Sequence, residues 1–60
     1  MKTYKSLSEF QLECIENNCK IKTITKSKNN THYKAFLDGR LVGFFNNFLN
    51  KEPYGQLSID

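Results

Sequence analysis

Two cysteines and one histidine carry the most versatile side-chain chemistry in this 60-residue chain. Cys14 and Cys19 lie five positions apart in a stretch with helical periodicity. On one helix they would point about 140° away from each other, so we expect no disulfide while the helix is intact. A structural zinc site takes four ligands at closely paired spacing, and beyond His32 the sequence offers no convincing fourth. The pattern predicts two reduced thiols that pack as small apolar side chains, with no metal and no cofactor.

Residues that catalysis uses are present, but not in catalytic arrangements. A Cys–His nucleophile pair needs spatial adjacency and an orienting third group, and the sequence supports neither. Glu9, Glu13 and Glu16 recur at helical spacing, which favours a solvated stripe. Glu16 would pair with Lys20 four residues later, and an acidic face that mimics a phosphate backbone or docks a basic partner is the functional alternative. No phosphate-binding glycine loop, Ser-His-Asp set or HExxH-type motif occurs, so we expect no enzyme.

Basic and aromatic residues are the strongest remaining signal. The net charge is +3, and the chain contains five Phe and three Tyr. All basic residues except Arg40 are Lys, and the abundance of Lys and Asn is typical of an AT-rich genome. Lysines interleaved with rings on a sheet are typical of proteins that bind single-stranded nucleic acid. Protein-binding patches show the same rings surrounded by polar groups.

The stretch SLSEFQLECIENNC predicts an amphipathic helix over about residues 8–18. Ser8 and Gln11 fit a capping box at its start, and a competing frame begins two residues earlier. At 100° per residue Leu7, Phe10 and Cys14 cluster on one side, and Ile15, Leu12 and Cys19 continue the arc, so we expect the helix to bury a broad face. The helix is expected to end near Asn17-Asn18, because asparagine tolerates the left-handed conformation of a helix cap.

Three strands are predicted after the helix, over about residues 20–26, 32–37 and 40–46. The first alternates β-branched residues with Lys, and Asp38-Gly39 between apolar runs is the signature of a two-residue type I′ hairpin turn. Because that turn fixes the register, it assigns alternate residues to opposite faces. One face should hold Tyr33, Ala35, Leu37, Val42 and Phe44. The other should hold His32, Lys34, Phe36, Leu41, Gly43 and Phe45, joined by Lys20, Lys22, Ile24 and Lys26 of the first strand.

These elements predict an α+β fold, with the N-terminal amphipathic helix packed on a three-stranded antiparallel β-meander. The chain is expected to form a single small domain over residues 1–60, and a chain of this size buries about 60% of its unfolded surface. The C-terminal tail, residues 47–60, is expected to add a short helix or an edge strand. Asn46 or Asn47 would cap that helix, and Pro53 would end it.

No segment of the sequence predicts membrane insertion or secretion. No apolar run approaches membrane-spanning length, and the opening MKTYKSLSEF lacks the apolar core of a signal peptide. We therefore expect a cytoplasmic protein with no membrane partner, located in the host cytoplasm if it is phage-encoded.

The second hairpin face mixes rings with basic groups and is the predicted partner-binding surface. A C-terminal tail folded back through Phe48, Leu49, Tyr54 and Leu57 would cover it, and the lysines would then only discourage edge-to-edge aggregation. Without that cover the face is available to a partner. The predicted contacts are Lys22, Ile24, Lys26, Lys34, Phe36, Arg40, Leu41 and Phe45.

The leading functional hypothesis is a small non-enzymatic regulator, an accessory or phage-type modulator, that binds a larger host protein stoichiometrically. The alternative is a protein that binds RNA or single-stranded nucleic acid through the same face. A homodimer formed through this face, with unknown activity, is the third. Salt dependence distinguishes nucleic-acid binding from the other two, because lysine–phosphate contacts release counterions.

Overall fold

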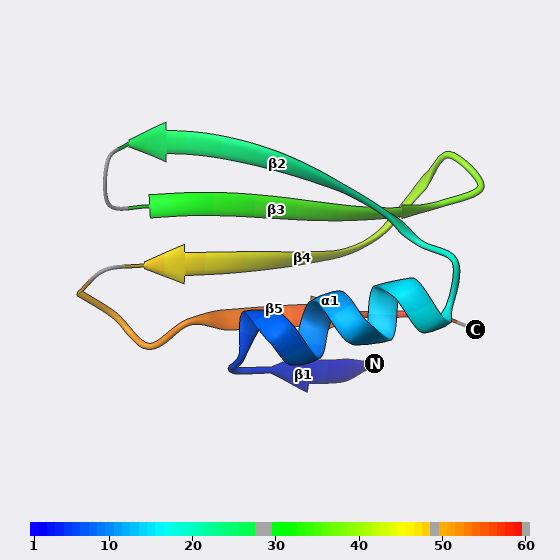
Figure 1. Ribbon diagram of the computed structural model, residues 1–60, viewed down its shortest axis with the longest axis horizontal. Helices are drawn as coiled ribbons and strands as arrows, with labels where there is room; N and C mark the ends of the chain where they lie inside the picture. The colour runs from blue at the N-terminus through cyan, green and yellow to red at the C-terminus, as the bar shows by residue number, and fades with distance from the viewer. Residues whose placement is uncertain (28–29, 49, 60) are drawn as a thin grey trace.

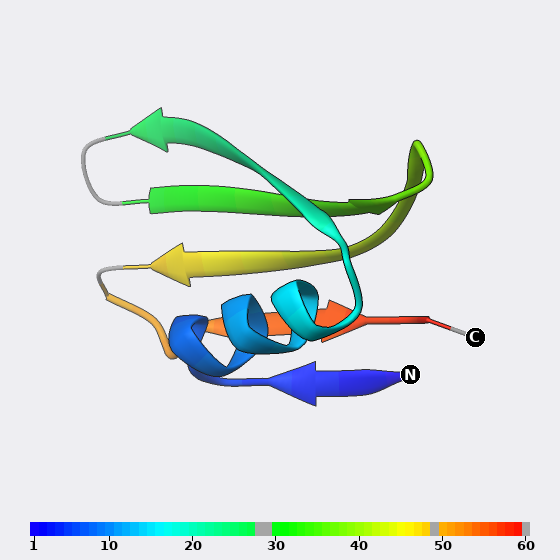
Figure 2. The same cartoon turned by 45° about the vertical axis from the view of Figure 1, so that its right-hand side comes forward.

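One helix and one five-stranded antiparallel sheet make up the fold. The computed structural model describes residues 1–27, 30–48 and 50–59, without the side chains of residues 25–27. The elements in chain order are β1 (Lys2–Tyr4), α1 (Leu7–Glu16), β2 (Lys20–Ser27), β3 (Asn30–Leu37), β4 (Arg40–Phe48) and β5 (Tyr54–Leu57). The strands lie in the order β1-β5-β4-β3-β2, and α1 crosses one side of the sheet over β5 and β1 (Figure 1, Figure 2).

The predicted α+β class is confirmed, and the sheet is larger than the predicted meander. β2, β3 and β4 form the antiparallel three-stranded part. β5 pairs with β4 on one side and with β1 on the other, so it is an internal strand and not the predicted edge strand. β1 was not predicted, because three residues are too few to show a period-2 pattern.

The C-terminal tail extends the sheet instead of folding over it. β4 continues through Asn46 and Asn47 to Phe48, so the predicted short helix capped by these residues is wrong. Asn46 pairs with Tyr54 of β5. The described part of the tail therefore lies in the plane of the sheet (Figure 1).

The core lies between α1 and the sheet and is built around Phe10, which is completely buried. Its ring centroid is 5.9 Å from that of Tyr4 and 5.4 Å from that of Phe45. A Cβ at Gly55 would lie 2.7 Å from the Phe44 carbonyl oxygen and would clash with the Phe45 ring, so glycine on β5 makes room for that ring. The buried members of the core are Tyr4, Phe10, Cys14, Ala35, Phe45 and Leu57. The buried face of the helix is narrower than predicted, because Leu12 and Ile15 are 56% and 69% exposed.

The helix begins earlier than the predicted capping box and ends as the sequence indicates. Ser6 is the N-cap residue, so Ser8 lies inside the helix, and the Ser6 side chain bonds to the Ser8 hydroxyl at 2.9 Å instead of capping. At the other end Asn18 adopts φ 60°, which confirms a left-handed cap near Asn17-Asn18 and assigns it to the second of the two. The chain therefore reverses direction directly after α1 and enters β2.

The β3–β4 hairpin has the predicted turn but not the predicted register. Asp38 and Gly39 both have positive φ, 52° and 80°, as a type I′ turn requires. The pairs next to the turn are as predicted, but a β-bulge follows, because Ala35 pairs with Gly43 and leaves Val42 as an extra residue. Every later pair is shifted by one residue.

The bulge exchanges the faces of two adjacent rings. Phe45 pairs with Tyr33 on the α1 side and is completely buried, whereas Phe44 pairs with Lys34 on the opposite side. The predicted assignment of Phe45 to the outer face and Phe44 to the inner face is therefore wrong. The physical reason is packing, since the bulge lets both Val42 and Phe45 contact the core.

Candidate nucleic-acid interface on the open face of the sheet

The face of the sheet turned away from α1 is covered by no described segment (Figure 1, Figure 2). We call it the open face. Its residues follow from strand alternation, because each neighbour of a buried core residue points to the other side. Ala35, Phe45 and Leu57 point toward α1, so Phe36, Phe44 and Gln56 belong to the open face.

The side chains of the open face form rows across the sheet, because each residue lies beside its partner on the next strand. The central row contains two lysines directly opposite each other, Lys22 on β2 and Lys34 on β3. In strand order from β2, the first row contains Lys20, Phe36 and Leu41. The central row contains Lys22, Lys34, Phe44, Gln56 and Thr3. The third row contains Ile24, His32, Asn46 and Tyr54, and a last pair is formed by Asn30 and Phe48.

Aromatic rings are distributed over the length of the open face. Phe36, Phe44 and Phe48 are half-buried, and Tyr54 is 38% exposed. The centroids of Phe44 and Tyr54 are 6.3 Å apart with the rings tilted by 52°. Gln56 Nε2 donates a hydrogen bond of 2.8 Å to the Tyr54 hydroxyl, which links these two exposed side chains.

Two shallow hollows flank these rings. One, of about 190 Å³, lies beside the Phe44 side chain and is lined by Leu41, Val42, Gly43, Phe44, Gln56 and Ser58. The other, of about 160 Å³, lies at the far end of the face and is lined by Asn30, Thr31, His32 and Phe48. The Nζ of Lys51 is 6.0 Å from the centroid of the Phe48 ring, which adds a positive charge at that end.

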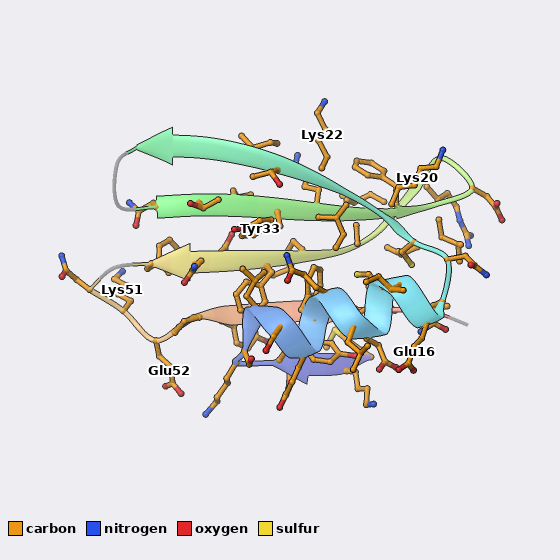
Figure 3. The ribbon with its side chains drawn as sticks, viewed as in Figure 1. Glu16, Lys20, Lys22, Tyr33, Lys51 and Glu52 are labelled. Atoms are coloured by element: carbon orange, nitrogen blue, oxygen red, sulfur yellow. The ribbon has the colours of Figure 1, made fainter. Side chains whose placement is uncertain are left out.

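The described side chains of the open-face rows carry positive charges and no negative ones. Lys20, Lys22 and Lys34 share the open face, and like charges directly opposite on neighbouring strands repel each other. Among the described residues no carboxylate belongs to the open-face rows. The three glutamates of α1 lie on the other side, and Figure 3 shows Glu16 near the helix end and well apart from Lys22 on the outer edge of β2.

Most of the predicted contact residues are brought together by the fold. Lys22, Ile24, Lys34, Phe36 and Leu41 share the open face, and Leu41 is 58% exposed. Arg40 pairs with Leu37 at the hairpin end, on the other side of the strand from Leu41, and Phe45 lies in the core. The side chain of Lys26 lies outside the described part of the structure.

Several residues of the open face were missing from the predicted contacts. Phe44 was missed because the Asp38-Gly39 turn sequence does not predict the bulge that moves Phe44 to this face. Phe48 and Tyr54 were expected only as cover for the face, and they are members of it. The alternation of Phe44, Asn46 and Phe48 was the available signal, since it continues β4 by two residues beyond its predicted end.

In the described part of the chain, no group of three His, Cys, Asp or Glu side chains is placed to hold a metal ion. No helix formed by the described residues is long and apolar enough to cross a membrane. Comparison of the chain with models of protein families, with curated proteins and with solved structures finds no match.

Proposed function

We propose that this protein is a non-enzymatic binding protein for single-stranded nucleic acid and that the open face is its binding surface. The observation that carries the proposal is a sheet face on which four rings and three lysines occur without a described carboxylate. Stacking of a base on such a ring contributes about 1–3 kcal/mol. Lysine neutralises phosphate and releases condensed counterions.

The ligand is expected to be single-stranded because the rings lie on a sheet. Bases in a duplex are stacked on each other and do not present their faces to a flat surface, whereas the bases of a single strand can splay onto rings. Lysine acts as a point charge and lacks the planar fork with which arginine reads guanine. We therefore expect binding that tolerates many sequences.

A protein partner fits the central row less well. The cores of protein interfaces are depleted in lysine, and burying Lys22 and Lys34 there would remove two like charges from water. A homodimer through this face would bring the lysines of two copies together. A polyanion instead relieves the repulsion between Lys22 and Lys34. A protein regulator with an acidic binding partner is the alternative outcome of the tests.

The salt dependence of binding tests this proposal directly. Fluorescence anisotropy with a labelled single strand of about 12 nucleotides should show affinity that falls between about 50 and 200 mM salt. Three lysine–phosphate contacts predict a slope of log affinity against log salt of about −2, at about 0.7 per phosphate on single strands. A duplex of the same length should bind more weakly.

A matched pair of charge variants identifies the surface. Lys34→Gln should reduce the slope by about 0.7, since one phosphate contact is lost. Lys2→Gln removes the same charge on the α1 side, where Lys2 Nζ lies 3.8 Å from the Glu13 carboxylate, and should leave the slope unchanged. Equal effects of the two variants, or no binding at low salt, would contradict the proposal. In that case, capture of a host protein that resists nuclease treatment would support the regulator.

A further inference from the structure

The end of α1 brings together two cysteines that the sequence separates by five positions. Cys19 N–H donates to the Cys14 carbonyl oxygen at 2.8 Å, and Asn18 N–H donates to the Ile15 carbonyl oxygen at 3.2 Å. With Asn18 at φ 60°, these two bonds form a Schellman motif. The first and last residues of this motif often make an apolar side-chain contact. Here both are cysteines.

The structure thereby overturns the geometric reason for expecting no disulfide. That reason placed both cysteines on one helix, pointing about 140° apart. The helix ends at Glu16 and the chain reverses at Asn18, so Cys19 returns toward Cys14. Cys14 is completely buried in the core cluster, and Cys19 packs against the same cluster. Both are free thiols in this structure.

The two thiols have different environments. Burial raises the pKa of Cys14 to about 11, with further contributions from the charge of the Cys19 thiolate and a hydrogen bond with it. Burial also raises the pKa of Cys19, but the hydrogen bond from Cys14 acts in the opposite direction. Cys19 is half-buried, whereas Cys14 has no exposed surface. A reagent in solution therefore reaches Cys19 first.

We propose that Cys14 and Cys19 are a redox modification site and form a reversible disulfide in the folded protein with a small-molecule disulfide as oxidant. The Cys19 thiolate attacks one sulfur of oxidised glutathione, forms a mixed disulfide and releases one glutathione thiolate. The Cys14 thiol then loses its proton and attacks the Cys19 sulfur, releasing the second glutathione thiolate. Two protein thiols are oxidised and one glutathione disulfide is reduced.

Closure of this disulfide ties the last turn of α1 to the residue that precedes β2. The folded chain holds the cysteines at the two ends of one cap, whereas the unfolded chain must find that geometry by chance. The fold should therefore favour the disulfide over the open dithiol. By thermodynamic linkage, folding raises the equilibrium constant for disulfide formation by a certain factor, and the disulfide raises the equilibrium constant for folding by the same factor.

Equilibration of the full chain with mixtures of reduced and oxidised glutathione tests the proposal. After acid quenching and alkylation of the remaining thiols, mass spectrometry should show a chain that has lost about 2 Da, without a glutathione adduct. The effective concentration of the two thiols should be at least about tenfold higher in native buffer than in denaturing urea. A persistent adduct at Cys19, or equal effective concentrations in both conditions, would overturn the proposal.

Single-cysteine variants assign the order of reaction. Cys14→Ser should accumulate the glutathione adduct at Cys19, whereas Cys19→Ser should remain unmodified while folded, because Cys14 is buried. Circular dichroism verifies that each variant is folded. Modification of folded Cys19→Ser would show that Cys14 reacts directly and would contradict the mechanism. The comparison of native and urea-treated wild type needs no variant, so it decides the proposal even where a serine at position 14 unfolds the chain.

Discussion

Phe44 and Phe45 are neighbours in the chain and lie on opposite faces of β4. Phe45 packs against Phe10 and Tyr33 under α1, with ring centroids 5.4 and 6.5 Å away. Phe44 lies beside Lys34 on the open face and contacts the Tyr54 ring. We therefore expect substitution of Phe45 to affect the stability of the fold and substitution of Phe44 to affect binding.

Substitution of each ring by serine should give opposite results. Phe45→Ser leaves a cavity and a hydroxyl in the core, at a cost of about 3–5 kcal/mol, which is comparable to the whole stability of a domain this small. Phe44→Ser should retain the circular dichroism spectrum and weaken nucleic-acid affinity about tenfold, through loss of one stacking contact. Thermal unfolding and fluorescence anisotropy measure both variants. An unfolded Phe44→Ser chain, or a folded variant with unchanged affinity, would contradict the assignment of Phe44 to the binding face.

The buried hydroxyl of Tyr4 predicts a loss of stability at high pH. Burial raises its pKa above 10.0, with further contributions from Glu13 and other nearby groups. The pKa of Cys14 rises in the same direction, from 9.0 to about 11. The unfolded chain releases both protons at lower pH than the folded chain does, so the free energy of unfolding should decrease as the pH rises above about 9.

A Tyr4→Phe variant isolates the contribution of the hydroxyl. The hydroxyl oxygen is buried and has no hydrogen-bond partner among the described residues, so its removal should cost little stability at pH 7. Urea unfolding at pH 7 and pH 11 should show a smaller pH-dependent loss in Tyr4→Phe than in wild type. An equal decrease in the free energy of unfolding in the two proteins would mean that folding does not raise the pKa of Tyr4.

At the level of elements, the sequence predicted α1 and the three strands that follow it within a few residues of their ends. Periodicity and turn chemistry are local properties, and these elements obey them. The bulge at Val42 is not local. It depends on the contact between the Phe45 and Phe10 rings, which are far apart in the sequence. It also depends on the close approach of Gly43 to Leu57, since a Cβ at Gly43 would lie 2.7 Å from the Leu57 side chain.

Of the two short strands, β1 was not predicted, and β5 was predicted only as one of two alternatives for the tail, for a related reason. β1 has three residues and pairs only with β5, and β5 has four residues and pairs with both β1 and β4. Neither has the length at which strand periodicity becomes visible, and their pairing joins the two ends of the chain. Both errors affected the predicted contacts. Phe45 was included because the bulge was not foreseen, and Tyr54 was omitted because the tail was not expected to extend the sheet.

The reversal at the end of α1 is an element that one substitution tests. Asn18 has a left-handed conformation, which glycine adopts freely, asparagine tolerates, and alanine adopts at a cost of about 1 kcal/mol. Asn18→Gly should therefore preserve or increase the free energy of unfolding, and Asn18→Ala should lower it by about 1 kcal/mol. Chemical denaturation measures both variants. The account of the reversal fails if alanine is tolerated better than glycine.

At the scale of the whole molecule, the two sides of the sheet differ in the side chains that they carry. The helix side carries the core and the glutamates of α1, and the open side carries rings and lysines. The molecule measures 32 × 19 × 15 Å, so its sheet face spans a few nucleotides of an extended strand. A net charge of +3 helps to attract an anionic ligand, and the distribution of that charge determines which face the ligand meets.

Intermolecular nuclear Overhauser effects with a short single-stranded oligonucleotide test the central claim most directly. Contacts between base protons and the rings of Phe36, Phe44 and Tyr54 are expected, together with broadening of the Lys34 side-chain signals. No contacts are expected to the outer residues of α1. Contacts confined to α1, or none at a concentration where the oligonucleotide is bound, would show that the open face is not the binding surface.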